Sequence, residues 1–182
     1  MQPPTLTTER LILRPFAATD ATDVQRLAGA REVALNTLHI PHPYLDGVAE
    51  AWIERIRQPE APETVFAIVP RETGELAGAV GLVPKEHDKA EIGYWIGVPY
   101  WGRGYATEAA SAVIAYGFEQ RGLNRIEACH FTRNPQSGRV LAKCGMQREG
   151  TWRQAIRKWD QYVDVTWWSI LRSEWERRPQ TR

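Results

Sequence analysis

A glycine-lined turn is the part of this sequence whose residue types and spacing most clearly suggest chemistry. Gly102-Arg103-Gly104 comes directly before a segment with helical periodicity, and no ordinary capping residue stands at its start. The first N–H groups of a helix lack partners within the helix, and the helix dipole adds partial positive charge there. Because glycines let an anion approach the backbone, the turn predicts a phosphate or diphosphate site beside Arg103. The alternative is a plain tight turn, since short glycine patterns are weak signals.

Two familiar nucleotide-binding loops do not fit this turn. A dinucleotide-binding fingerprint requires a third glycine, and Thr107 stands at the position expected for it. A P-loop requires Gly-Lys followed by Ser or Thr, which the sequence around Gly104 lacks. The predicted anion site therefore belongs to a different kind of turn.

Hydrophobic periodicity predicts the elements that position this turn. Short polar connections between three neighbouring strands indicate an antiparallel meander. The expected strands are 8–15, 64–70, 75–84, 90–98, 124–131, about 146–155 and about 162–172. The expected helices are one capped by Thr19 or Asp20 and ending at Gly29, one capped by Asp46 and ending before Pro59, one from Gly104 to Gly122, and one from Asn134 to Cys144. These patterns predict a mixed α/β fold, in which about four helices flank a mostly antiparallel sheet of about seven strands.

Bulk properties limit the function classes. The 182 residues suffice for one domain and no boundary divides them, so we expect a single domain over 1–182. The net charge of +1 gives no general attraction for nucleic acid. No apolar stretch approaches the roughly 18 residues of a membrane span, and the first residues lack a signal-peptide pattern. We therefore expect a cytoplasmic protein with no membrane partner.

The two cysteines do not form a recognisable framework. Cys129 and Cys144 have neither CxxC spacing nor a histidine pair at zinc-site distance. We therefore expect two reduced thiols, no disulfide and no metal site.

Three segments resemble the GNAT superfamily of acetyl-CoA-dependent N-acetyltransferases, and within it the branch that contains the ribosomal-protein N-terminal acetyltransferases. They are AEIGYWIGV (90–98), PYWGRGYATEA (99–109) and RNPQSGRVLAKCGMQREG (133–150). The resemblance covers nearly the whole chain, and GRGYATEA is among its most specific parts. Trp101 departs from the family pattern, which usually has glutamine or arginine there, but a cradle of backbone N–H groups does not depend on that side chain.

The resemblance implies a site for acetyl-CoA. Backbone amides of the turn would hold its diphosphate, and its pantetheine arm would lie between the strands at 90–98 and 124–131, paired with main-chain groups as an added strand would be. Arg139 and Lys143 are candidate partners for the remaining phosphate charge, with solvated surface cations as the alternative. The cofactor-binding residues so implied are Ile96, Gly97, Val98, Gly102, Arg103, Gly104, Tyr105, Ala106, Thr107, Asn134 and Ser137.

Two residues match family positions that move protons. Glu91 stands where related acetyltransferases carry a general base, and Ser137 matches the serine that protonates the coenzyme sulfur. Each has a structural alternative: Glu91 as an ion-paired carboxylate at the start of a strand, and Ser137 as a hydroxyl in the first turn of a helix. Asn134 matches a coenzyme contact and is also an ordinary N-cap before a proline.

The resemblance implies a primary amine as the acceptor, either a protein N-terminus or a small molecule. An α-amino group titrates near about 8, whereas a lysine amine at about 10.4 needs stronger help from a base. The loop HIPHPY (39–44) would build the acceptor pocket, in which His39 and Tyr44 would bind the acceptor together with Trp95. Because histidine suits proton transfer near neutral pH, Glu91, His39 and water remain candidate bases. Ile156 stands where ribosomal-protein acetyltransferases can carry a late carboxylate, so the same acid–base arrangement is not expected here.

Two main interpretations of the chain stay open at this point, beside a nucleotide-binding protein of another fold. The first is an N-acetyltransferase in which the amine attacks the thioester directly in a ternary complex, since no motif places a cysteine as a nucleophile. The second is a catalytically silent acyl-CoA-binding or regulatory module, which the departures at Trp101 and Ile156 keep open. A homodimer is compatible with the resemblance, because proteins of this branch are often dimeric.

Overall fold

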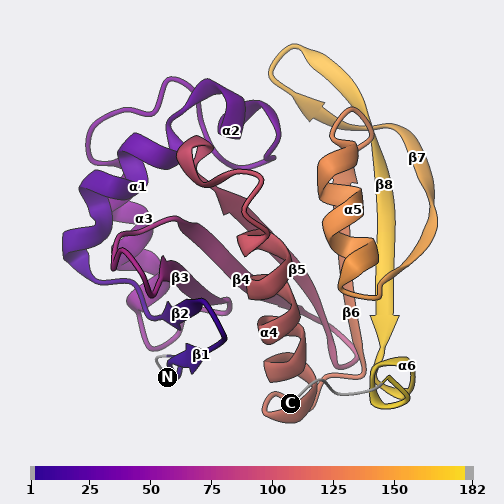
Figure 1. The fold of residues 1–182 in the computed structure, drawn as a ribbon. Coiled ribbons are helices and arrows are strands. Elements are labelled where there is room, and N and C mark those ends of the chain that lie inside the picture. Colours follow the sequence, from indigo (N-terminus) through magenta and orange to yellow (C-terminus); the bar gives the residue numbers. More distant parts are fainter. Residues whose placement is uncertain (1–2, 179–182) are drawn as a thin grey trace.

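Eight strands form one sheet in the computed structural model, which describes residues 3–178 (Figure 1). Their order is β1-β2-β3-β4-β5-β6-β8-β7, and all neighbours are antiparallel except β5 and β6. The strands are β1 (Leu6–Thr7), β2 (Leu11–Arg14), β3 (Thr64–Pro70), β4 (Gly78–Lys85), β5 (Lys89–Ile96), β6 (Arg125–Phe131), β7 (Gln147–Lys158) and β8 (Gln161–Leu171). The mixed and mostly antiparallel sheet confirms the predicted fold class.

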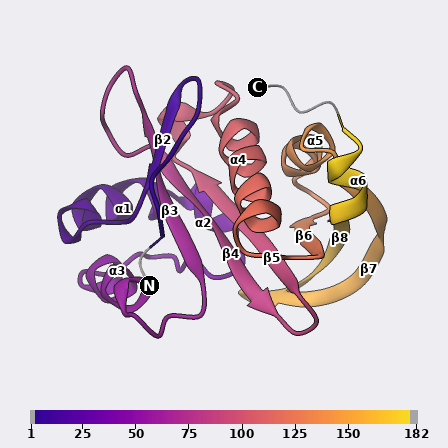
Figure 2. The same cartoon turned by 90° about the horizontal axis from the view of Figure 1, so that it is seen from below.

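Helices cover both faces of this sheet (Figure 2). They are α1 (Ala21–Ala28), α2 (Arg31–Leu35), α3 (Val48–Arg57), α4 (Tyr105–Glu119), α5 (Pro135–Lys143) and α6 (Arg172–Glu176). A Cβ added at Gly97, just after β5, would meet Leu27 of α1, whereas a Cβ added at Gly117 of α4 would meet Leu82 and Ile126 of the sheet. Thus α1, with α3 beside it, covers one face, and α4, with α5 beside it, covers the other.

Short elements account for most of the differences from the predicted fold. The chain before Pro15 is a hairpin of β1 and β2 rather than one strand over 8–15, which brings the strand count to eight. The five-residue helices α2 and α6 were not expected. The start of α6 is held by Glu174, whose carboxylate accepts a hydrogen bond from the N–H of Leu171 at 2.9 Å.

The start of α3 corrects another expectation. Its N-cap is Gly47, with φ of 82°, and not Asp46. The carboxylate of Asp46 instead accepts a hydrogen bond from the side-chain amide of Gln25 at 2.8 Å. A contact with α1 therefore replaces the local cap that the sequence favoured.

The parallel pair β5–β6 separates soon after it begins. Lys89, Ala90 and Glu91 pair with the first three residues of β6, Arg125–Glu127, and the described residues beyond them form no further pairs between these strands. The remaining part of each strand therefore runs along a gap in the middle of the sheet. The two halves of the sheet are β1–β5 and β6–β8.

Three further features bear on the classes of site. Within residues 3–178, no helix combines the length and apolar character needed to cross a bilayer. In the same range, no group of three or more His, Cys, Asp or Glu side chains is arranged to hold a metal ion. Cys129 and Cys144 are free thiols, as the sequence predicts.

Candidate active site

The turn before α4 presents a set of unused backbone donors. Gly102 and Gly104 have φ of 76° and 82°, the left-handed region that glycine adopts most easily. Gly104 is the N-cap of α4, no side chain caps the helix, and the first helical bond runs from the N–H of Glu108 to the carbonyl of Gly104 at 3.1 Å. The six N–H groups from Gly102 to Thr107 donate no hydrogen bond to any described residue. These donors and the helix dipole favour an anion.

A clamp of two charged residues holds this turn from behind. The carboxylate of Glu108 accepts hydrogen bonds from Thr8 Oγ1 at 2.6 Å and from the backbone N–H and Nε of Arg10, each at 2.8 Å. Arg10 Nη1 in turn donates to the carbonyl of Arg103 at 2.9 Å. Because the N–H of a trans peptide points opposite to its carbonyl, the N–H of Gly104 is directed away from Arg10. The clamp therefore orients one donor of the turn.

The ionisation of Glu108 reflects this clamp. Partial burial alone would raise its pKa, but the hydrogen bonds from Thr8 and Arg10 outweigh burial and hold the pKa below its ordinary value. The carboxylate is therefore charged at neutral pH and keeps Arg10 in place.

A cleft of about 470 Å³ opens in front of the turn. Arg139 and Lys143 of α5 line it, as do most residues of the turn, so positive charge faces the donors. The side chain of Arg103 does not line it, because its guanidinium lies 3.8 Å from the carboxylate of Glu72 and over the ring of Tyr100. The residues present therefore fit a diphosphate with further phosphate charge, and Arg103 would offer such a group its backbone N–H only.

The main-chain groups that face the gap between β5 and β6 differ in part from those expected. The N–H of Gly97 donates to the carbonyl of Ala77, just before β4, at 2.9 Å, and the Gly97 carbonyl accepts from the N–H of Tyr100. Since backbone groups alternate in direction along a strand, those of Tyr94 and Ile96 face the gap instead. The carbonyl of Ile96 accepts a hydrogen bond from Trp101 Nε1 at 2.7 Å.

One correction to the predicted set follows, because Gly97 uses both of its backbone groups within the chain. Val98 lies in a short 3₁₀ turn, where its carbonyl accepts from the N–H of Trp101 and its own N–H donates no hydrogen bond to a described residue. The N–H groups of Ile96 and Tyr94 face the gap. The indole of Trp101, which departs from the family pattern, satisfies the carbonyl at the end of β5.

Ser137 meets Tyr94 across the gap. The Tyr94 hydroxyl lies 2.9 Å from Ser137 Oγ and 3.2 Å from the Ser137 carbonyl oxygen. Asn134 caps α5 by accepting from the N–H of Ser137, and it also lines the cleft. Burial raises the pKa of Tyr94 far above its ordinary value, although the bond to Ser137 opposes the shift. Tyr94 is therefore a neutral phenol that can supply a hydrogen bond or a proton to Ser137.

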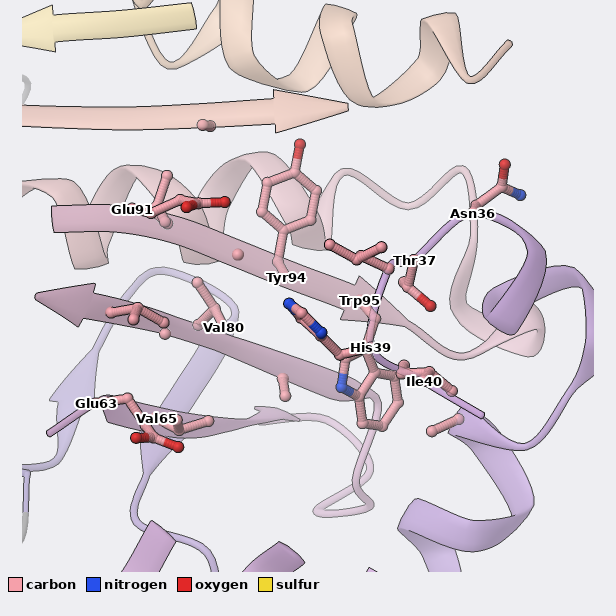
Figure 3. A pocket seen from close by; sticks show the side chains of 18 of the residues that line it. Asn36, Thr37, His39, Ile40, Glu63, Val65, Val80, Glu91, Tyr94 and Trp95 are labelled. Atoms are coloured by element: carbon pink, nitrogen blue, oxygen red, sulfur yellow. The ribbon is translucent and has the colours of Figure 1, made fainter. Parts of the chain in front are cut away.

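A second cavity of about 570 Å³ lies on the side of the sheet covered by α1 and α3 (Figure 3). Glu91, Tyr94 and Trp95 reach it from β5, and His39 and Ile40 reach it from the loop after α2. Ile156, which stands where a late carboxylate was considered, and Tyr44 also line it. The sequence-predicted acceptor residues thus lie around one cavity.

The two cavities meet. Their shared lining residues are Asn36, Thr37, Tyr94, Trp95 and Ser137. A molecule held by the glycine turn and a molecule held in the larger cavity can therefore touch at the Tyr94–Ser137 contact.

Two titratable side chains of the larger cavity differ in their chemical capacity. Glu91 forms an ion pair with Lys85 at 3.1 Å, so the structural alternative considered for it is realised while its side chain still lines the cavity. Burial, and then the nearby Glu91, raise the pKa of the Cys129 thiol to about 11. A thiol that stays protonated at neutral pH is a poor nucleophile, so the site lacks an activated cysteine at this position.

Two cations from beyond the gap hold the end of α2 and the loop that follows it over the larger cavity. Lys158 Nζ, on β7, donates to the carbonyls of Leu38 and Ile40 at 3.1 and 3.0 Å, and Arg133 donates to the carbonyl of Leu35 at 2.9 Å. Burial, and then the charge of Arg133, lower the pKa of Lys158. These bonds bridge the gap and fix the backbone on either side of His39.

Several residues of the site were missed by the sequence analysis. Tyr94 was read only as part of a strand, although its alternation with Glu91 and Trp95 assigns it to the face of α5. Nothing local links Arg10 to the turn or Lys158 to the loop. Asn36 and Thr37 follow a helix that was not predicted, and their side chains donate hydrogen bonds to its carbonyls. Their place in the site therefore could not be predicted from the sequence.

A diphosphate cradle that opens onto a gap between two parallel strands is the arrangement of a coenzyme A-dependent acyltransferase. Residues 10–147 match the family model described as the acetyltransferase (GNAT) domain, so the chain belongs to the GNAT acetyltransferases. The family uses acetyl-CoA, and the chain is an acetyl-CoA-dependent N-acetyltransferase.

Individual relatives agree with this family. The chain is 35% identical over 176 residues to an N-acetyltransferase called p20, itself uncharacterized, from Bacillus licheniformis, covering 94% of this chain and 98% of p20. It is similar to the crystal structure of a GNAT-family acetyltransferase from Bacillus anthracis, with a TM-score of 0.84, 26% identity, and coverage of 94% and 100%. It also shares the fold of a ribosomal-protein-S5-alanine acetyltransferase from Vibrio fischeri, with a TM-score of 0.81, 21% identity, and coverage of 97% and 100%. Ribosomal-protein acetyltransferases are thus distant relatives, as the sequence resemblance implies.

Proposed function

We propose that this enzyme acetylates a primary amine by direct attack in a ternary complex, without an acyl-enzyme. The observation that carries the proposal is the junction of the two cavities at Tyr94 and Ser137. An acetyl donor in the cleft and an amine in the larger cavity would meet there without a carrier residue. The raised pKa of the Cys129 thiol removes the cysteine of that cavity as a carrier.

The chain's own groups would hold acetyl-CoA along the cleft. The six N–H groups from Gly102 to Thr107 would receive the diphosphate, and Arg139 and Lys143 would balance its further charge. The N–H groups of Tyr94 and Ile96 would pair with the pantetheine arm or stabilise the acetyl carbonyl oxygen as charge develops on it. Acetyl-CoA itself supplies an activated acetyl group, from which the amine displaces the thiolate.

Ser137 would donate the proton that the departing sulfur needs. Its hydroxyl lies at the junction, and the Tyr94 hydroxyl 2.9 Å away can replace the proton that Ser137 gives up. In the net reaction a C–N bond forms, the C–S bond breaks, one proton leaves the nitrogen and one reaches the sulfur. Tyr94, whose pKa burial raises, would remain a proton donor throughout the working pH range.

Glu91 is the candidate for the nitrogen's proton. Its side chain lines the acceptor cavity, and Lys85 keeps a positive charge beside it. His39 lines the same cavity from the loop and is the second candidate, with water as the third. An amine with a low pKa would need this help least, because more of it is already neutral.

The acceptor would be a protein N-terminus or a small-molecule amine. His39, Tyr44 and Trp95 would contact it, since all three line the acceptor cavity. The absence of a carboxylate at Ile156 separates the site from the arrangement considered for ribosomal-protein acetyltransferases.

The test is release of free CoA thiol from acetyl-CoA in the presence of a broad panel of amines, with acetyl-CoA binding measured by calorimetry in parallel. We expect binding, and thiol release above the amine-free rate with at least one class of amine. Binding without release for any amine in the panel would instead indicate a catalytically silent module. A burst of thiol release before amine is added, equal to the enzyme concentration, would contradict direct attack.

A further inference from the structure

Gly93 is an open position in the centre of the sheet. It lies in the middle of β5, yet it is exposed, and a Cβ added there would meet no heavy atom within 4 Å. Its neighbours in the sheet differ: a Cβ at Gly78, Gly81 or Gly97 would approach other atoms to 2.2, 2.8 and 2.6 Å. Those three glycines are explained by packing, and Gly93 is not. Its φ lies outside the left-handed region, so backbone conformation does not explain it either.

The floor of the acceptor cavity explains this glycine. Side chains alternate along a strand, so Gly93 shares a face with Glu91 and Trp95. Gly81 of β4 stands directly opposite it in register, and both glycines line the larger cavity. A glycine inside a strand often marks a place where a ligand approaches the backbone. The space above Gly93 therefore belongs to the acceptor.

The walls of this space favour an apolar molecule. The residues that cover it from α1 and α3 are Val24, Ala28, Val48 and Trp52. Two carboxylates in the lining already have partners, because Glu63 is ion-paired with Arg55 and Glu91 with Lys85. An acceptor with a charged body would have to break one of these pairs or remain unpaired in an apolar space.

We propose that the acceptor is a primary amine with an apolar body that lies across the backbone of Gly93, and that the missing side chain at this position sets the size of body accepted. This inference rests on the proposed function, since it assigns the acceptor to the larger cavity. It adds a substrate class and a specificity-determining residue. A side chain at position 93 would project into the cavity and displace the acceptor's body without disturbing the core.

The test compares Gly93→Ala and Gly93→Leu with wild type on three amines: ethylamine, hexylamine and phenethylamine. Wild type is expected to release thiol faster with the two larger amines. Gly93→Leu should lower kcat/KM for these two by about 10-fold or more, while ethylamine changes by less than about 3-fold and CoA affinity stays the same. Gly93→Ala should give the same ranking with smaller losses.

Gly150→Leu is the matched control. Gly150 is also a strand glycine where an added Cβ meets nothing within 4 Å, but it lies on β7 and lines neither cavity. It should leave all three rates unchanged, and thermal unfolding of both leucine variants separates a folding defect from loss of space. If Gly93→Leu does not fold, the alanine variant carries the comparison.

Four results would overturn the inference. Equal losses for all three amines, or no loss for any, would show that position 93 does not set acceptor size. A wild-type preference for ethylamine, or for amines with a charged body in the broader panel, would remove the apolar class while leaving the acetyltransferase assignment intact. Calorimetric titration of phenethylamine into the CoA complex gives an independent readout, because Gly93→Leu should weaken this binding even if turnover fails altogether.

Discussion

Arg10→Met removes the side chain that orients the anion turn. The variant loses the 2.9 Å hydrogen bond to the carbonyl of Arg103 and the ion pair with Glu108, whose nearest atoms are 2.6 Å apart. Half-exposed ion pairs contribute about 0.2–1 kcal/mol, and one hydrogen bond about 1 kcal/mol. We therefore expect the free energy of unfolding to fall by about 1–2 kcal/mol. Of these interactions, only the hydrogen bond to the Arg103 carbonyl holds the turn itself. The free energy of CoA binding should therefore weaken by about 1 kcal/mol, which raises the dissociation constant about 5-fold.

Calorimetry with CoA and steady-state rates with acetyl-CoA give the two readouts. The dissociation constant for CoA and the KM for acetyl-CoA should rise together, while kcat at saturation stays near the wild-type value, because the turn lies away from the reacting atoms. Arg71→Met is the control. Arg71 is an exposed arginine that donates to the carbonyl of Glu9 at 2.9 Å on the same hairpin, but it does not touch the turn.

Two outcomes would refute the reasoning about Arg10. If Arg10→Met lowers stability as Arg71→Met does and leaves CoA affinity unchanged, the bond to Arg103 does not orient the donors. If kcat falls and KM stays the same, the clamp acts on the chemistry rather than on the cofactor.

Four other predictions test the remaining parts of the site. Ser137→Ala should lower kcat about 100-fold and change CoA affinity less than about 2-fold; a pure binding defect would make Ser137 a contact residue. Glu91→Gln should reduce kcat/KM most for the amines of highest pKa, and an equal loss for all amines would mark the carboxylate as structural. Gly104→Ala puts a side chain at φ of 82°, a strain of about 1–2 kcal/mol, and should weaken CoA binding about 10-fold, whereas Gly122→Ala, strained alike at φ of 68° but outside the site, should leave binding unchanged. Because the pKa of Glu108 is lower in the folded state, its stabilisation is present above about pH 4 and is lost as the pH falls through the folded pKa, so chemical unfolding of wild type should show a steeper acid loss than that of Glu108→Gln.

Elements defined by local patterns could be predicted from the sequence. The strand over 64–70 has the predicted bounds, because an apolar run ends at a proline and a polar turn. The start of α4 is also local, since two glycines in the left-handed region and the lack of a cap are properties of one short segment. The cap at Asp46 was wrong because a contact with Gln25, 21 positions earlier, competes with the local role of that carboxylate. A local pattern predicts an element well only where the residues of that element do not bond to a distant part of the chain.

The candidate site follows the same division. The glycine turn is local and was predicted, but its clamp joins Arg10 to Glu108 across 98 positions. The contact of Tyr94 with Ser137 spans 43 positions and arises because β5 and β6 separate after three pairs. Nothing in the alternation of β5 indicates where that separation begins. The main-chain groups assigned to Gly97 were misplaced, because the direction of each N–H of β5 depends on its register with β4.

The loop over the acceptor cavity shows most clearly why the acceptor site is harder to predict from the sequence than the donor site. Lys158 reaches across 120 positions to Leu38, and it bonds to backbone carbonyls rather than to side chains. Every residue has a backbone carbonyl that can accept such a bond. The side chains at 38–40 therefore do not indicate the contact that holds this segment. The donor half of the site consists of backbone groups whose geometry requires glycine, and these glycines can be identified directly in the sequence. The acceptor half of the site consists of side chains such as His39 and Ile40, and contacts from distant parts of the chain set their positions. The chemistry of the acceptor half can therefore be inferred only after the fold brings the two halves of the sheet together.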